Sequence, residues 1–144
     1  MKPFASLLAL IIAAPAAAWE FSADPICTLD HVTDEAGLRV TFDPSIPEYA
    51  IALTLTGAEW PVAEAFGIRF EGARPNVIAT DRHVLSDADR TLTVRDSGFG
   101  NVLDGLEFND IATALTGGAA VSFPLDDAAG PVAAFRACIA APSV

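Results

Sequence analysis

Lysine is almost absent from this sequence. The 144 residues include one lysine, Lys2, and seven arginines against 19 acidic residues, which gives a formal net charge of −11. Beyond residue 2, this composition excludes Schiff-base catalysis, a Ser-x-x-Lys nucleophile and the phosphate-binding loop that ends in Gly-Lys. Such an acidic chain repels nucleic-acid backbones and anionic lipid headgroups, so we expect neither as a partner. The simplest explanation of this negative charge is that it keeps the protein soluble. The alternative explanation is that it attracts a basic partner or a divalent cation.

Cysteine is scarce as well, with Cys27 and Cys138 near opposite ends of the chain. Neither belongs to a C-x-x-C motif. The sequence also lacks C-x-x-C-H, H-E-x-x-H and G-x-S-x-G, so the signatures of c-type haem attachment and of two hydrolase classes are missing. In an oxidising compartment such an even pair predicts a structural disulfide, with a catalytic thiol or a zinc site as alternatives. Closing a loop of about 110 residues would stabilise the fold by roughly 4–5 kcal/mol.

Long hydrophobic runs are missing too, except at the N-terminus. Residues 1–18 combine a basic start at Lys2, an apolar stretch over 4–14 and small residues at 16–18, a pattern typical of a cleaved secretory signal peptide. The stretch is too short to span a bilayer, and the cleavage point has no cysteine for a lipid anchor. We therefore expect residues 19–144 to form one exported domain, periplasmic or secreted, without stable membrane association.

The rest of the chain is a series of short segments in which apolar and polar residues alternate. The alternation predicts half-buried strands at 38–42, 49–55, 66–70, 91–95 and 121–125. Segments rich in Asp, Gly, Pro and Ser predict turns at 34–37, 43–47 and 86–89, and a longer loop at 57–65. The predicted fold class is α+β: a mainly antiparallel β-sheet, as a sandwich or partly closed barrel, with one or two C-terminal helices.

Two segments in the last third have apolar residues at helical spacing. The first, Asn101–Thr116, is closed by two glycines; Gly105 weakens its first half, which leaves a helix beginning near Asn109 as the alternative. The second runs from Pro131 to Ala140. A disulfide from this second helix would attach it to the first strand.

Two residues are candidates for catalysis. Asp96, in Asp96-Ser97-Gly98, matches the tripeptide of aspartic proteases, but its flanking residues do not, and one copy would require a homodimer. His83 has Asp81 nearby and Ser86 three residues on, as in a hydrolase. If Val84 points inward, however, His83 is an ordinary surface histidine. We interpret His31, which we place on the opposite face of its strand from Leu29, in the same way.

Three further residues are candidates for binding. Asp87 and Asp89 offer two oxygens for calcium, although the continuation of an EF-hand loop is missing and no metal or cofactor is expected. Trp60, in a proline-containing loop, is either an exposed aromatic anchor for a partner or a cap on one end of the sheet.

Several segments carry a family resemblance: Trp19–Ser22, Pro25–Thr28, Thr80–Ser86, Gly98–Phe108 and Ala134–Cys138. Together they resemble a family of small exported alphaproteobacterial proteins of unknown function, over nearly all of residues 19–144. Its members often bear the name of the helicase component of excinuclease ABC, which the residues contradict, because a repair helicase needs a phosphate-binding lysine. From Phe108 to Cys138 the chain is also distantly similar to the invasion-associated locus B proteins of bacterial envelopes. The resemblance implies no catalytic residues.

The leading hypothesis is a monomeric, non-enzymatic periplasmic domain that binds a protein or a small ligand in the cell envelope. It rests on the export signal, the predicted disulfide and the missing catalytic sets. The alternative is a small secreted hydrolase that uses Asp96 or His83.

Overall fold

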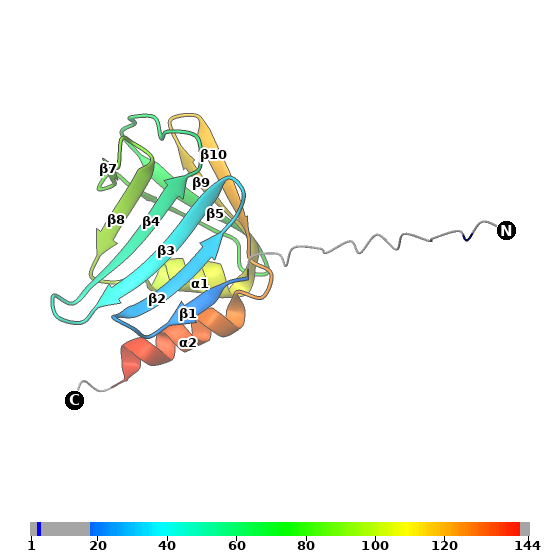
Figure 1. Ribbon diagram of the computed structural model, residues 1–144. Coiled ribbons are helices and arrows are strands. Elements are labelled where there is room, and N and C mark those ends of the chain that lie inside the picture. Colours follow the sequence, from blue (N-terminus) through cyan, green and yellow to red (C-terminus); the bar gives the residue numbers. More distant parts are fainter. Residues whose placement is uncertain (1–2, 4–17, 142–144) are drawn as a thin grey trace.

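The computed structural model describes residue 3 and residues 18–141, which form two antiparallel sheets and two helices (Figure 1). The predicted signal peptide, apart from Pro3 and Ala18, lies outside the described residues. The six-stranded sheet has the order β1 (Glu20–Ser22), β2 (Cys27–Val32), β3 (Ala36–Asp43), β4 (Glu48–Leu55), β8 (Thr91–Asp96), β7 (Val84–Ser86). The four-stranded sheet has the order β10 (Ala119–Pro124), β9 (Asn109–Thr116), β5 (Phe66–Gly72), β6 (Asn76–Thr80). The helices are α1 (Gly100–Phe108) and α2 (Ala129–Ala140). The predicted α+β class is confirmed.

The central strands of the six-stranded sheet follow directly from the alternation in their sequences. On β3, Leu38 and Val40 are at most 3% exposed, whereas Arg39 between them lies on the outer face. The register sets Val40 opposite Ile51 of β4, which is 1% exposed, so the two apolar rows share one face. On the outer face, Arg39 donates to Asp30 of β2, with 2.7 Å between Nε and Oδ1. Because side chains alternate along a strand, this register buries Leu38, Val40, Ile51 and Leu53 on one face.

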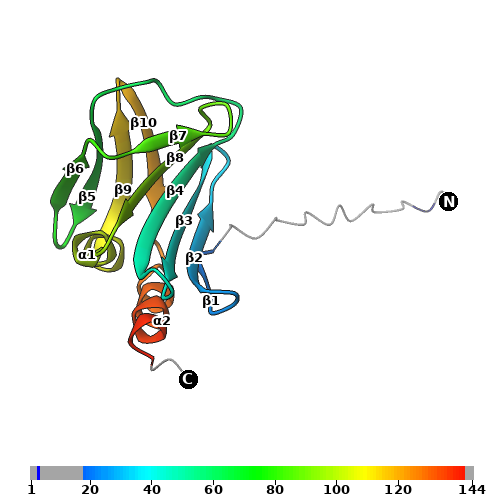
Figure 2. The ribbon, with the colours of Figure 1, turned by 90° about the vertical axis from the view of Figure 1, so that its left-hand side faces the viewer.

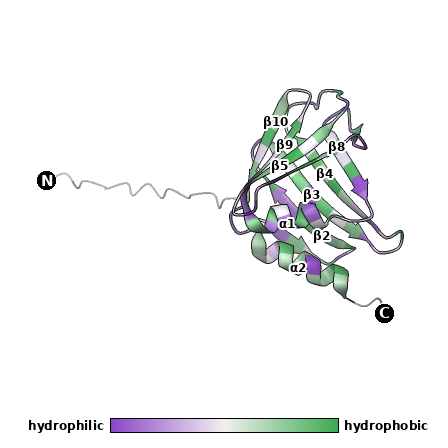
Figure 3. Ribbon diagram, turned by 180° about the vertical axis from the view of Figure 1, so that it is seen from behind, coloured by the Kyte–Doolittle hydropathy of each residue, from purple (hydrophilic) through white to green (hydrophobic). Residues whose placement is uncertain are grey.

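The two sheets pack face to face around a common core (Figure 2). The four-stranded sheet contributes aromatic rings, including Phe70 of β5 and Phe123 of β10, each 1% exposed, and the six-stranded sheet contributes aliphatic side chains such as Leu53 of β4. α2 contributes Val132 and Phe135, both fully buried, and it contacts β1, β2 and α1. In Figure 3, α2 is coloured mostly as hydrophobic, which fits a helix that covers one end of the sandwich.

The sheets form an open sandwich because, within the described residues, no strand pairing joins one sheet to the other. Two gaps between sheet edges follow. We call the gap between β10 and β1–β2 the closed seam. We call the gap between β6 and the second half of β8 the open seam. It exists because β7 pairs with Thr91–Thr93 of β8, and no strand among residues 18–141 pairs with Val94–Asp96 on that side.

Trp19 fills the closed seam. The indole Nε1 of Trp19 donates to the Pro124 carbonyl on β10 at 3.0 Å, and its ring stacks on His31 of β2 with 4.4 Å between centroids. The predicted disulfide is present: Cys27 of β2 is bonded to Cys138 of α2, with their Cα atoms 6.0 Å apart. The bond attaches the last helix to the six-stranded sheet.

The helix prediction for Asn101–Thr116 is wrong in its second half, and so is the alternative that begins near Asn109. Residues 100–108 form α1, and the chain then continues as β9 between β5 and β10. Asn109 marks the change: its Nδ2 donates to the Gly105 carbonyl at 3.1 Å, and its Oδ1 accepts the Arg74 amide at 3.0 Å. Gly105 is required inside the helix, because a Cβ there would meet the ring of Phe70. The prediction for Pro131–Ala140 is confirmed by α2.

Candidate ligand-binding site

The open seam contains a cavity of about 460 Å³. Its walls come from both sheets, and the start of α1 with the loop before it closes one side. It is lined by Ile51, Phe66, Ile68, Ile78, Ala79, Thr80, Arg82, Val94, Asp96, Gly98, Phe99, Gly100, Asn101 and Val102. This volume lies within the range of about 300–1,000 Å³ that is typical of small-molecule sites.

The inner part of the cavity is apolar. Ile51 and Val94 line it from the six-stranded sheet, and Phe66 and Ile68 line it from the four-stranded sheet. These four side chains are between 1% and 8% exposed, so the cavity reaches into the core between the sheets. Ile78 of β6 is only partly buried and lies nearer the surface. An apolar molecule bound here would be covered from both sheets and so removed from water on two opposite sides.

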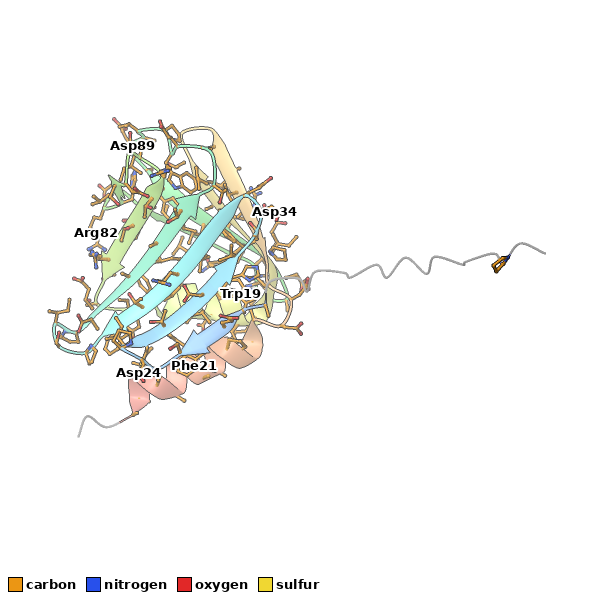
Figure 4. The ribbon with its side chains drawn as sticks, in the orientation of Figure 1. Trp19, Phe21, Asp24, Asp34, Arg82 and Asp89 are labelled. Atoms are coloured by element: carbon orange, nitrogen blue, oxygen red, sulfur yellow. A yellow bond between two sulfur atoms is a disulfide. The ribbon has the colours of Figure 1, made fainter. Side chains whose placement is uncertain are left out.

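The mouth of the cavity is polar and carries one ion pair. Arg82 Nη2 donates to Asp96 Oδ2 at 2.8 Å, and the two side chains are 64% and 36% exposed. Figure 4 places Arg82 at the β8 edge of the six-stranded sheet, away from Trp19 near the opposite edge. Asp96 Oδ1 also accepts the backbone N–H of Ser97 at 2.7 Å. That N–H, together with the charge of Arg82, lowers the pKa of the Asp96 carboxyl, which is therefore ionised at neutral pH.

Aromatic stacking holds the α1 side of the cavity in place. Phe99, 4% exposed, stacks on Tyr49 of β4 with 5.3 Å between ring centroids, and Tyr49 packs in turn on Phe42 of β3 at 4.7 Å. The Phe99 carbonyl accepts the Leu103 amide at 2.9 Å, which begins α1. The wall formed by residues 98–102 is therefore fixed to the six-stranded sheet.

The surface interpretation of His83 is wrong. Val84 is 63% exposed and points outward, whereas His83 is half-buried: its Nε2 lies 3.0 Å from the Ala63 carbonyl, and its ring lies 6.2 Å from that of Phe66. His83 therefore joins the 57–65 loop to the segment that crosses between the sheets. In the hydrogen bonds of the described residues, neither Asp81 nor Asp96 is its partner.

His31 and Trp60 are buried as well. The surface interpretation of His31 is wrong, because residues two apart on a strand share a face: Leu29 and His31 are 0% and 6% exposed. Burial lowers the pKa of His31, and the backbone of Ala18 opposes this effect. Trp60 is 2% exposed and donates from Nε1 to the Leu53 carbonyl at 3.0 Å. It caps the end of β4 and provides no exposed anchor.

Asp87 and Asp89 belong to the tight turn between β7 and β8. Asp87, Ala88 and Asp89 all have positive φ, between 52° and 63°, and the Asp87 carboxylate pairs with Arg90 at 3.0 Å. Among the described residues no group of three or more His, Cys, Asp or Glu side chains is placed to hold a metal ion. The geometry at this turn is that of a hairpin.

The sequence candidates contribute only Asp96 to the cavity. Sequence reasoning missed Arg82 and Ile78, because a lone arginine and a lone isoleucine have no pattern that separates them from surface charge and ordinary core. Their common signal is spatial, since the segments 78–82 and 94–102 come together at the open seam.

Comparison with known proteins gives no relative: no family model, no curated protein and no solved structure matches the chain. In residues 18–141, no helix is long and apolar enough to cross a membrane.

Proposed function

We propose that this protein binds a small, largely apolar molecule in the cavity at the open seam. The observation that carries the proposal is the contrast between the two seams. The closed seam is filled by Trp19, whereas the open seam keeps a cavity of about 460 Å³ between buried walls. The cavity opens to solvent at its mouth, and a concave site of this volume with apolar inner walls is typical of small-molecule binding.

The surroundings of the cavity suit a preformed site. Phe99 is stacked on Tyr49, and Phe66 and Ile68 belong to a strand that is paired on both sides. A cavity whose walls are ordered before the ligand arrives loses little conformational entropy on binding. Its apolar walls would supply the driving force at about 25 cal/mol per Å² of apolar surface removed from water.

We place this activity in the cell envelope. The export signal predicted for residues 1–18 directs the chain out of the cytoplasm, and the Cys27–Cys138 bond is typical of an oxidising compartment. An apolar ligand is poorly soluble in such an aqueous compartment, which gives a binding protein a task there.

The features of the site favour binding over hydrolysis. A shared-proton carboxylate pair or a general acid needs a raised pKa, whereas the pKa of Asp96 is lowered by Ser97 and Arg82. His83 Nε2 is within hydrogen-bond distance of the Ala63 carbonyl. On these grounds we propose binding in preference to the hydrolase alternative.

A neutral fluorescent probe, N-phenyl-1-naphthylamine, tests the proposal, because its emission rises when it leaves water. The test variant is Ile78→Trp, which fills the cavity from β6. The matched control is Val77→Trp, because Val77 is 63% exposed and does not line the cavity. We expect saturable binding to wild type and to Val77→Trp, and at least tenfold weaker binding to Ile78→Trp. Equal binding to all three proteins, or no binding to wild type, would overturn the proposal.

A further inference from the structure

We infer that the ligand is a small amphiphile whose carboxylate end pairs with Arg82 at the mouth of the cavity. The inference rests on the proposed function and adds the head group. Among the described lining residues, Arg82 is the only cation and Asp96 the only anion, and both lie at the polar end of the cavity. A ligand with one polar end would therefore enter with its chain toward Ile51 and Ile68 and its head at this ion pair.

The hydrogen-bonding capacity of the ion pair decides the chemistry of the head group. The Asp96 carboxylate already accepts from Arg82, from the Ser97 amide and from the Ser97 hydroxyl, which uses about three of its roughly four acceptor sites. A guanidinium has five N–H donors, and within the described residues that of Arg82 uses only Nη2. Within the ion pair the spare capacity is therefore in the donors of Arg82, which favours an incoming acceptor.

A carboxylate fits these donors better than a neutral acceptor does. Guanidinium and carboxylate form paired, charge-assisted hydrogen bonds, which are roughly twice as strong as neutral ones. Asp96 keeps its bonds to Ser97 when Arg82 turns toward a ligand, so the exchange leaves no carboxylate without a partner. Arg82 is 64% exposed and can make this movement without opening the core.

The acidic surface makes Arg82 the deciding residue. With a formal net charge of −11, the protein repels anions at long range, and Asp96 adds a local repulsion. Selection of a carboxylate over the matching alcohol must therefore come from Arg82. Removal of this one cation should reverse the preference.

The test compares octanoate with octan-1-ol, which share an apolar chain and differ in the head group, by isothermal titration calorimetry. The variants are Arg82→Gln, Asp96→Asn and the control Arg95→Gln. Arg95 is a close match to Arg82, because it is also 64% exposed and also pairs with a carboxylate, Glu48, yet it does not line the cavity.

We expect wild type and Arg95→Gln to bind octanoate more tightly than octan-1-ol. Arg82→Gln should lower the affinity for octanoate at least tenfold and change the affinity for octan-1-ol less than about twofold. The alcohol then becomes the tighter ligand. Asp96→Asn should strengthen octanoate, because it removes the competing charge. Equal affinities for the two ligands, or equal losses for both in Arg82→Gln, would overturn the carboxylate assignment while the cavity still binds. Binding of neither ligand, together with no binding of the naphthylamine probe, would overturn the proposed function as well.

Discussion

Replacing Gly105 with alanine should destabilise the protein, although alanine is the better helix former. Gly105 lies inside α1, where the change would ordinarily stabilise by up to about 1 kcal/mol. In this fold the new Cβ would meet the ring of Phe70, with the ring Cγ only 2.6 Å away. Phe70 is 1% exposed in the core between the sheets, so its ring has no free space into which to move.

The balance of these two effects gives the magnitude. Inserting a methyl group into a well-packed core typically costs about 1–3 kcal/mol, which exceeds the gain in helix propensity. We expect a net loss of about 1–2 kcal/mol in the free energy of unfolding. For a domain of this size that loss corresponds to a fall in Tm of roughly 3–8 °C.

Urea denaturation followed by circular dichroism measures the change, with thermal melting as a second readout. The matched control is Gly130→Ala, because Gly130 is an exposed helical glycine whose Cβ would meet nothing within 4 Å. We expect Gly130→Ala to leave the stability unchanged or raise it by up to about 1 kcal/mol. A gain in stability for Gly105→Ala as large as that of the control would refute the packing of α1 on Phe70.

Three further predictions concern the rest of the fold. Replacing Cys27 and Cys138 with serine should lower the free energy of unfolding by about 4–5 kcal/mol. Urea denaturation of the wild type with and without reductant measures the same loss, and a midpoint that reductant leaves unchanged would contradict the prediction. Burial lowers the pKa of His31 below 6.5, so the unfolded chain takes up the proton first and stability should fall as pH drops below about 6.5. His31→Phe, which keeps a ring on Trp19, should lose less stability between pH 7 and pH 5, and parallel curves for the two proteins would contradict this. Trp60→Phe should cost about 2 kcal/mol, because the Leu53 carbonyl loses its donor; a change below about 0.5 kcal/mol in chemical denaturation would argue against that bond.

The strands could be predicted because the deciding information is local. Leu38 and Val40 alternate with polar neighbours, and the same alternation on β4 sets the register. Side chains two residues apart on a strand lie on the same face of the sheet, so a short alternating segment is enough to predict which face is buried.

The boundary between α1 and β9 could not be predicted, because its causes lie elsewhere in the chain. Gly105 looks like a weak point of a helix until Phe70, far away in sequence, is seen against it. Asn109 looks like a helical residue until its side chain is seen bonded to Gly105 and to Arg74. Tertiary contacts override propensity at both positions.

The histidines show a different kind of error. The prediction for His31 puts it on the wrong face although it lies two residues from Leu29, and the period of two buries both. For His83 the error comes from Val84, which is apolar but lies on the exposed face of an edge strand. A short edge strand buries few side chains, so apolar character alone does not set its direction.

The candidate site itself has no local signature. The site exists because β7 pairs with only the first half of β8. The second half of β8 therefore faces β6 across the open seam. Of its polar residues, the sequence singles out only Asp96, and for a different chemistry. Arg82 is distinguished by its place at the mouth, which follows from the crossing of the chain between the two sheets.

The most direct test of the central claim is a nuclear magnetic resonance titration of the disulfide-bonded protein with octanoate. If octanoate binds at the open seam, the backbone amide chemical shifts of residues 78–82, 94–96 and 98–102 should change together and fit one Kd. The amide shifts of the closed-seam residues around Trp19 should stay unchanged. Shift changes centred on the closed seam, or scattered over the surface without saturation, would contradict it.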